Sequence, residues 1–251
     1  LPPRHMDSVV AIVEAPAATD PDVTGTVPEL ARALGGCSTP GCRAVLGEPP
    51  DVPPAPRTLS QCPAIVPRCM WGARPYRGTP KPLTLPLGSV YIHHTFIPST
   101  PCRTFAACAR DMRAMQRFHQ DTRGWDDIGY SFVVGSDGYL YQGRGWHWVG
   151  AHTKGYNSKG YGVSYVGDFS ATLPDPDAIA LVRDRLLPCA VRTRRLHRNY
   201  TLRGHRQMGL TDCPGNSLFH EIETWHGFEV GPKLCGISRG REVPRSGLSG
   251  L

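Results

Sequence analysis

The sequence predicts a protein of the α/β class. Between residues 61 and 228, segments with the pattern of strands alternate with segments of helical spacing, and such interleaving is typical of that class. The 251 residues suffice for one sizeable domain with an extension. Eleven of the 25 prolines lie in residues 1–60. We therefore assign 1–60 to a Pro-rich N-terminal extension or linker, 61–228 to the domain, and the Gly-, Ser- and Arg-rich residues 229–251 to a loose tail.

The first half of the domain contains a strand, a helix and a hairpin. The β-branched and aromatic residues of 89–93 (SVYIH) predict a buried strand. The segment YSFVVGSDGYLYQGR predicts a hairpin that turns at Asp137-Gly138. Helical spacing over residues 103–121 predicts an amphipathic helix whose inward face carries Phe105, Ala109, Met112, Met115 and Phe118.

The second half repeats this alternation. Residues 161–167 (YGVSYVG) and 200–204 predict strands. Asp175-Pro176 suits the N-cap and first turn of a helix that runs toward Leu187. A last helix over 216–226 would place Leu218, Ile222 and Trp225 inward. A short helix over 27–34 is also compatible with the extension.

The charge is strongly basic and unevenly placed. Residues 1–60 hold four arginines against seven acidic residues, whereas the remainder carries a net charge of +10. A basic surface fits nucleic acid, an anionic membrane or an acidic polymer. Because no basic run is interleaved with aromatic residues, we do not expect nucleic-acid binding. No apolar run reaches 18 residues, so we expect no transmembrane segment.

Cysteine usage favours an oxidising compartment. The nine cysteines include two closely spaced pairs that suit local disulfides, Cys37 with Cys42 and Cys102 with Cys108, and no C-x-x-C occurs. The sequon at Asn199 permits N-glycosylation. We expect a secreted, extracellular protein whose signal peptide is not present in this chain, since LPPRHMDSVV contains no apolar segment.

Three places carry residue types that suit metal chemistry. His93 ends a predicted strand, His205 follows another, and Cys213 lies eight residues further on. Two histidines and a thiolate would leave a fourth zinc position open for water, as catalytic zinc sites do. From residue types alone, ten histidines and nine cysteines also allow many accidental trios.

Three segments resemble those of the peptidoglycan recognition proteins, which are related to zinc-dependent type-2 amidases: VYIHHT, GWDDIGYSFVVGSDGYLYQGRGWHWVGAH and LRGHRQMGLTDCPG. The resemblance runs from about Cys62 to Phe228, and it is strongest to the long mammalian form, an N-acetylmuramoyl-L-alanine amidase. It implies a mixed central β-sheet flanked by about three helices around a groove. It also implies a role in innate immunity, with bacterial peptidoglycan and its muropeptides as partners and a monomer as the oligomeric state.

The resemblance implies specific roles in catalysis. His93, His205 and Cys213 fall on the ligands of one Zn²⁺, and Tyr130 and Thr211 fall on catalytic positions. Zinc acidifies a water to a pKa of about 7 and polarises the lactyl–L-Ala carbonyl, while the Tyr130 hydroxyl donates to the oxyanion. No Glu occupies the motifs, so the proton shuttle stays unassigned. The alternative is a non-catalytic pattern-recognition protein, and retention of Cys213 favours the enzyme.

The resemblance also places substrate contacts along the groove, at His94, His119, Gly124, Trp125, Arg144, Trp146 and His152. His94 has an equally good structural interpretation, His119 suits a solvated helix face, and Trp146 suits a core. Gly124, Trp125 and Arg144 resemble the pattern of members that favour meso-diaminopimelate over lysine peptides, because an arginine can bind the extra carboxylate. Alternatively, Arg144 only shields an acid such as Asp127.

The disulfides of the family are implied in part. Cys102 with Cys108 and Cys62 with Cys189 match two family bridges, whereas Asp126 stands where a third would need a cysteine. Cys69 and Cys235 are left without an assigned partner, and their pairing with each other stays open.

Overall fold

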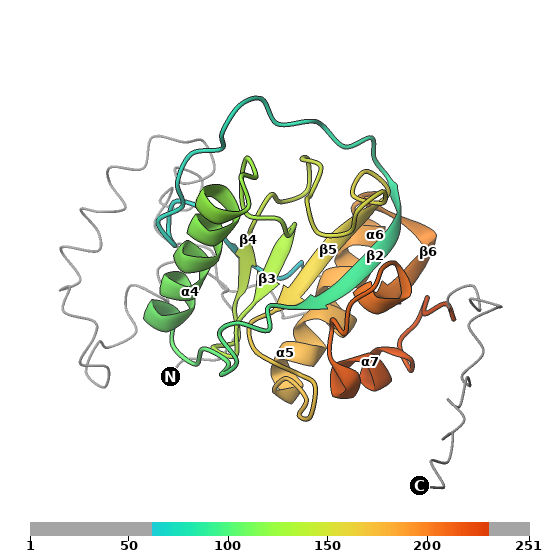
Figure 1. Ribbon diagram of the computed structural model, residues 1–251. Helices are drawn as coiled ribbons and strands as arrows, with labels where there is room; N and C mark the ends of the chain where they lie inside the picture. The colour runs from blue at the N-terminus through green and yellow to red at the C-terminus, as the bar shows by residue number, and fades with distance from the viewer. Residues whose placement is uncertain (1–61, 231–251) are drawn as a thin grey trace, which may run out of the picture.

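The computed structural model describes residues 62–230, which form a six-stranded mixed sheet (Figure 1). Its order is β1-β4-β3-β5-β2-β6, and its members are β1 (Ile65–Val66), β2 (Leu87–His94), β3 (Phe132–Val134), β4 (Leu140–Gln142), β5 (Gly160–Tyr165) and β6 (Leu196–Gly204). β3 and β4 are antiparallel and form the predicted hairpin, while the other neighbouring strands are parallel. The predicted mixed α/β sheet is confirmed.

Helices cover both faces of this sheet (Figure 1). Helix α4 (Phe105–Arg117) packs on one face and continues into a π-helical turn, Phe118–Thr122. On the other face lie α5 (Pro176–Ala180), a π-helical segment (Leu181–Leu186) and α6 (Leu187–Arg192), which follow one another without a break, and α7 (Asn216–Ile222). None of the described helices is long and apolar enough to cross a bilayer.

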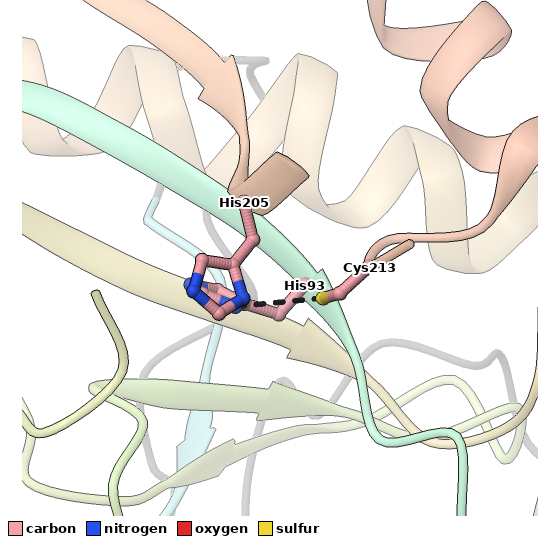
Figure 2. A group of neighbouring side chains, drawn as sticks. All are labelled: His93, His205 and Cys213. Carbon is pink, nitrogen blue, oxygen red and sulfur yellow. Dashed lines mark hydrogen bonds between the residues drawn. The ribbon is translucent and has the colours of Figure 1, made fainter. Parts of the chain in front are cut away.

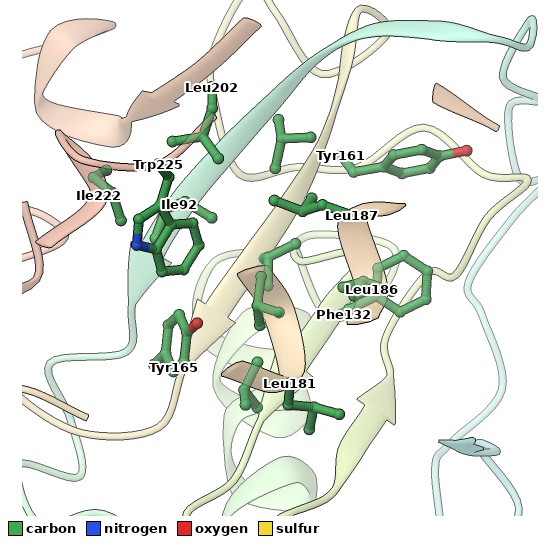
Figure 3. Close-up of a cluster of buried hydrophobic side chains, with 14 of the residues drawn as sticks. Ile92, Phe132, Tyr161, Tyr165, Leu181, Leu186, Leu187, Leu202, Ile222 and Trp225 are labelled. Carbon is green, nitrogen blue, oxygen red and sulfur yellow. The ribbon is translucent and has the colours of Figure 1, made fainter. Parts of the chain in front are cut away.

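Alternation along β2 and β5 separates the core from the open face of the sheet. Val90 and Ile92 of β2, with Tyr161, Val163 and Tyr165 of β5, pack against α5, α6 and α7 (Figure 3). The opposite face of β5 carries only small residues at the alternate positions: Gly160, Gly162 and Ser164. This face leaves room for larger side chains to lie across the strand.

The helix over 103–121 buries a different residue at its end from the one predicted. Ala109, Met112 and Met115 are buried as predicted, but Phe118 is 46% exposed, so its predicted inward position is wrong. The buried residues Cys108, Met112, Met115 and His119 follow one another at intervals of three and four, so α-helical spacing itself places His119, and not Phe118, on the buried face. His119 consequently turns inward and is 8% exposed, in contrast to a solvated helix face.

Two disulfides join parts of the described chain. Cys62 pairs with Cys189 of α6, and Cys102 pairs with Cys108 of α4. Cys69 is also disulfide-bonded. Cys235, the partner left open above, lies outside the described residues, as do Cys37, Cys42 and the helix expected over 27–34.

The start of α5 has the predicted position but a different contact. Asp175 is its N-cap residue and Pro176 its first helical residue, yet the Asp175 side chain caps no backbone N–H. Its carboxylate instead accepts two hydrogen bonds from the Arg103 guanidinium, at 2.7 and 3.3 Å. The aspartate therefore ties α5 to the segment that precedes α4.

Candidate metal centre

His93, His205 and Cys213 converge from three segments at one edge of the sheet (Figure 2). His93 lies near the carboxyl end of β2, and His205 directly follows β6, which pairs with β2 in parallel. Their potential ligand atoms all lie within 4.8 Å of one another, with Cys213 Sγ 3.7 Å from His93 Nδ1. This is the one such group among residues 62–230.

Backbone and hydroxyl contacts fix the loop that carries Cys213. The Cys213 N–H donates to Thr211 Oγ1 at 3.2 Å, and the Arg206 N–H donates to the Cys213 carbonyl at 2.7 Å. The His94 N–H points at the Cys213 sulfur from 3.4 Å. Thr211 thus shapes the loop, and the N–H of His94 can stabilise a thiolate.

Burial tunes the protonation of the three side chains. Desolvation lowers the pKa of His93 well below its ordinary value and also lowers the pKa of His205, so both imidazoles are neutral at pH 7. Desolvation raises the pKa of the Cys213 thiol to about 12, so a nearby cation is needed to hold it as a thiolate. Two neutral imidazoles and one sulfur fit the donor preferences of zinc.

Tyr130 lies next to the metal centre. Its ring centroid is 5.3 Å from that of His93. Desolvation, with a smaller contribution from Cys213, raises the pKa of Tyr130 far above its ordinary value. The phenol therefore keeps its proton and can act as a hydrogen-bond donor at neutral pH.

His152 lies across the open face of β5. Its ring is 5.2 Å from that of His93 and is 7% exposed. A Cβ on Gly162 would lie 2.3 Å from this ring, and one on Gly150 would lie 2.4 Å from it. The two glycines therefore make the space in which His152 lies.

His119 lies on the side of the site formed by Tyr130 and Trp125. Its Nδ1 accepts a hydrogen bond from the Gly129 N–H at 3.1 Å, so its proton resides on Nε2. The ring stacks on Trp125 at 4.7 Å and lies 5.9 Å from Tyr130. Burial lowers the pKa of His119 to about 4, which keeps the ring neutral.

A cavity of about 340 Å³ adjoins this side of the site. Gly124, Trp125 and Arg144 line it, as does Lys81, which has no acidic partner among residues 62–230. Arg144 donates to the carbonyls of Ile128 and Val149 and to the Tyr76 hydroxyl. Nothing in the sequence pointed to Tyr76 or Lys81.

Asp127, the acid that Arg144 was considered to shield, is neutralised by a different arginine. The Asp127 carboxylate is paired with Arg68, 2.9 Å away, and accepts from Gln116 at 2.7 Å. Arg144 reaches only the Asp127 carbonyl, at 3.4 Å. Arg68 therefore neutralises Asp127, and Arg144 braces the cavity wall.

Two residues expected in the groove lie elsewhere. His94 is buried on the opposite face of β2 from His93, where its Nδ1 accepts from the Phe169 N–H at 3.2 Å, which corresponds to the structural alternative. Trp146 packs in the core, 4.3 Å from Phe132, with the Arg195 guanidinium 4.8 Å from its ring. These contacts of the partly buried Trp146 correspond to its core interpretation.

The predicted glycosylation residue is accessible. Asn199 lies on β6, a strand at the edge of the sheet, and its side chain is exposed. The structure therefore leaves room for a glycan at this position, well along the strand from His205.

A family model described as N-acetylmuramoyl-L-alanine amidase matches residues 84–216. The N-acetylmuramoyl-L-alanine amidase of Mus musculus is 65% identical over 167 residues, which cover 66% of this chain and 32% of that protein. Peptidoglycan-recognition protein 1 of Holotrichia diomphalia is 40% identical over 174 residues, which cover 68% of this chain and 85% of that protein.

Solved structures show the same fold. The crystal structure of peptidoglycan recognition protein-LE, in complex with the diaminopimelic acid-type peptidoglycan monomer tracheal cytotoxin, is 43% identical with a TM-score of 0.64. The similarity covers 66% of this chain and 96% of that one. The chain therefore spans nearly all of this recognition protein's domain, but only 32% of the length of the mouse relative.

Proposed function

Since this chain belongs to the N-acetylmuramoyl-L-alanine amidase family, we propose that it is a zinc-dependent amidase of bacterial peptidoglycan. It hydrolyses the amide between the lactyl group of N-acetylmuramic acid and L-alanine. The observation that carries the proposal is the convergence of His93, His205 and Cys213 within 4.8 Å, beside the protonated phenol of Tyr130.

Each residue of the site has a defined task in this reaction. His93 and His205 offer imidazole lone pairs, and Cys213, once deprotonated, offers a sulfur supported by the His94 N–H. Zinc, when bound, supplies Lewis-acid polarisation of the carbonyl and an acidified water. Tyr130 donates to the oxygen on which negative charge develops. Water adds to the carbonyl carbon as the C–N bond breaks, which leaves a lactyl carboxylate and the free amino group of L-alanine.

Zinc content and peptide release test this function together. The purified full chain should bind one zinc and release stem peptide from peptidoglycan, and chelation should abolish release until zinc is restored. Cys213→Ser should lose both zinc and turnover because the thiolate ligand is removed, yet still bind muropeptide. Peptide release by zinc-free Cys213→Ser protein would contradict the mechanism. Binding of muropeptide without release by the zinc-loaded unmutated chain would favour a recognition protein instead.

The cavity beside His119 supports a preference for meso-diaminopimelate peptides. Their third residue carries one more carboxylate than lysine, and Lys81 and Arg144 bring two positive charges to the cavity wall. Recognition protein-LE, which is similar to this chain, is described in complex with a diaminopimelic acid-type ligand. We expect preference and not exclusion, since an amidase has to accept several stem peptides.

The disulfides support an extracellular setting for this activity. Cys62–Cys189 and Cys102–Cys108 are of the kind that persists in oxidising compartments. A secreted amidase that degrades bacterial wall fragments would act in innate immunity. Peptidoglycan binding by the purified chain before and after reduction of these disulfides would test whether the activity depends on an oxidising compartment.

A further inference from the structure

Thr153 lies beside the candidate metal centre, although no sequence pattern singles it out. Its side chain is 1% exposed. The hydroxyl lies 3.0 Å from His152 Nδ1 and 3.4 Å from His93 Nε2, the second distance being long for a hydrogen bond. The backbone N–H groups of His152 and Thr153 both donate to Asn157 Oδ1, at 2.8 and 2.7 Å. Asn157 therefore fixes the loop that presents this hydroxyl.

The two ring nitrogens of His93 face different neighbours, and this determines which atom donates in each hydrogen bond. His93 Nδ1 faces Cys213 Sγ, so its lone pair lies on the metal side. The proton of the neutral ring then resides on Nε2, which donates to Thr153 Oγ1. The Thr153 O–H is left to donate to His152 Nδ1. In this arrangement His93 and His152 are both neutral, and both carry their proton on Nε2.

We infer that Thr153 is a positioning residue for the metal, acting through His93. It fixes the tautomer and the ring orientation that direct His93 Nδ1 at the zinc. A partner of this kind on the outer nitrogen of a metal-bound histidine typically changes metal affinity 10- to 100-fold. The inference rests on the proposed function, since it requires that zinc bind at His93, His205 and Cys213.

Zinc affinity separates this role from simple filling of buried space. Thr153→Val keeps the shape of the side chain but cannot accept the proton of His93, so its zinc Kd should rise about 10- to 100-fold. Thr153→Ser retains the hydroxyl and should keep an affinity near that of the unmutated chain. Thr104→Val is a matched control, because it removes the hydroxyl that accepts from the Ala107 N–H at the start of α4. Its zinc affinity should not change.

Competition with a chromophoric chelator measures these affinities on the full chain. An unchanged Kd in Thr153→Val, or an equal loss in Thr153→Val and Thr153→Ser, would overturn the inference while leaving the zinc site of the unmutated chain intact. Absence of zinc binding by the unmutated chain would overturn both the inference and the proposed function.

Nitrogen NMR of the unmutated, zinc-loaded chain gives a readout that does not depend on the folding of any variant. His93 should carry its proton on Nε2 with Nδ1 on zinc, and His152 should carry its proton on Nε2. A His93 bound through Nε2, or a His152 protonated on Nδ1, would contradict the hydrogen-bond direction on which the role of Thr153 depends.

Discussion

The Tyr130 hydroxyl combines a position beside the metal centre with a raised pKa. Tyr130→Phe removes only that donor, so turnover should fall about 10²- to 10³-fold while zinc content stays at one per chain. Tyr161→Phe is the matched control, since its hydroxyl donates to the Trp146 carbonyl away from the metal centre. Steady-state rates and metal analysis on both variants test this. Loss of zinc from Tyr130→Phe would make Tyr130 structural.

Arg144 should determine part of the discrimination between stem peptides. Arg144→Ala should reduce the preference for diaminopimelate over lysine muropeptides about ten- to hundredfold, or about 1.5–3 kcal/mol. Because Arg144 also braces Ile128 and Val149, the ratio of the two turnover rates is the appropriate readout. That ratio does not depend on how much protein is folded.

The control for this substitution is Arg195→Ala, which removes a guanidinium that lies over Trp146 and outside the cavity. Its ratio of turnover rates should equal that of the unmutated chain. Equal turnover of the two muropeptide types by the unmutated enzyme would refute the assignment of Arg144.

At this scale, residues with distinctive chemistry could be predicted and their supporting residues could not. His93, His205 and Cys213 stand out by residue type and motif, and the structure brings them together. Thr153, Tyr76 and Lys81 are ordinary surface-compatible residue types, and Tyr76 and Lys81 lie in a stretch without regular periodicity. Their contacts arise only from the folded path of the chain.

The small residues on the open face of β5 leave the space that His152 occupies. Gly162→Ala should displace the His152 ring, since the new Cβ would lie 2.3 Å from it. Such overpacking costs about 1–3 kcal/mol of unfolding free energy and should weaken muropeptide binding as well. Gly88→Ala on β2 is the control, because its Cβ would meet nothing within 4 Å. Chemical unfolding of the two variants measures the difference, and equal stability would show that His152 can move freely.

The types of the elements could be predicted from local sequence patterns, whereas the exact residues that face the core at the end of a helix could not. The hairpin around Asp137-Gly138 and the strand that ends at His94 lie where the sequence placed them. The helix over 103–121 is α-helical up to Arg117 and a π-helical turn follows it, and the buried residue at its end is His119 in place of the predicted Phe118. Helical periodicity assumes 3.6 residues per turn, so it cannot anticipate a change of helix type.

The whole molecule brings the metal centre together from distant parts of the chain. His93 and Cys213 are 120 residues apart in sequence, and the parallel pairing of β2 with β6 places His93 and His205 at one edge. Cys62–Cys189 closes a further long loop, with a separation of 127 residues. These long-range contacts are all made by residues of the proposed domain.

Residues 1–60 should therefore be dispensable for catalysis. They contain none of the proposed ligands, and their proline-rich composition is that of a linker. A chain that begins at Arg57 keeps Cys62 for its bond to Cys189, so it should retain the zinc affinity, the thermal unfolding midpoint and the rate of peptide release of the full chain. A shorter chain that begins at Ala64 loses that disulfide, and its midpoint should fall, since a bond closing so long a loop typically contributes about 2–5 kcal/mol. If the chain beginning at Arg57 binds zinc but releases no peptide, the N-terminal residues take part in substrate binding and the assignment of 1–60 as a linker is wrong.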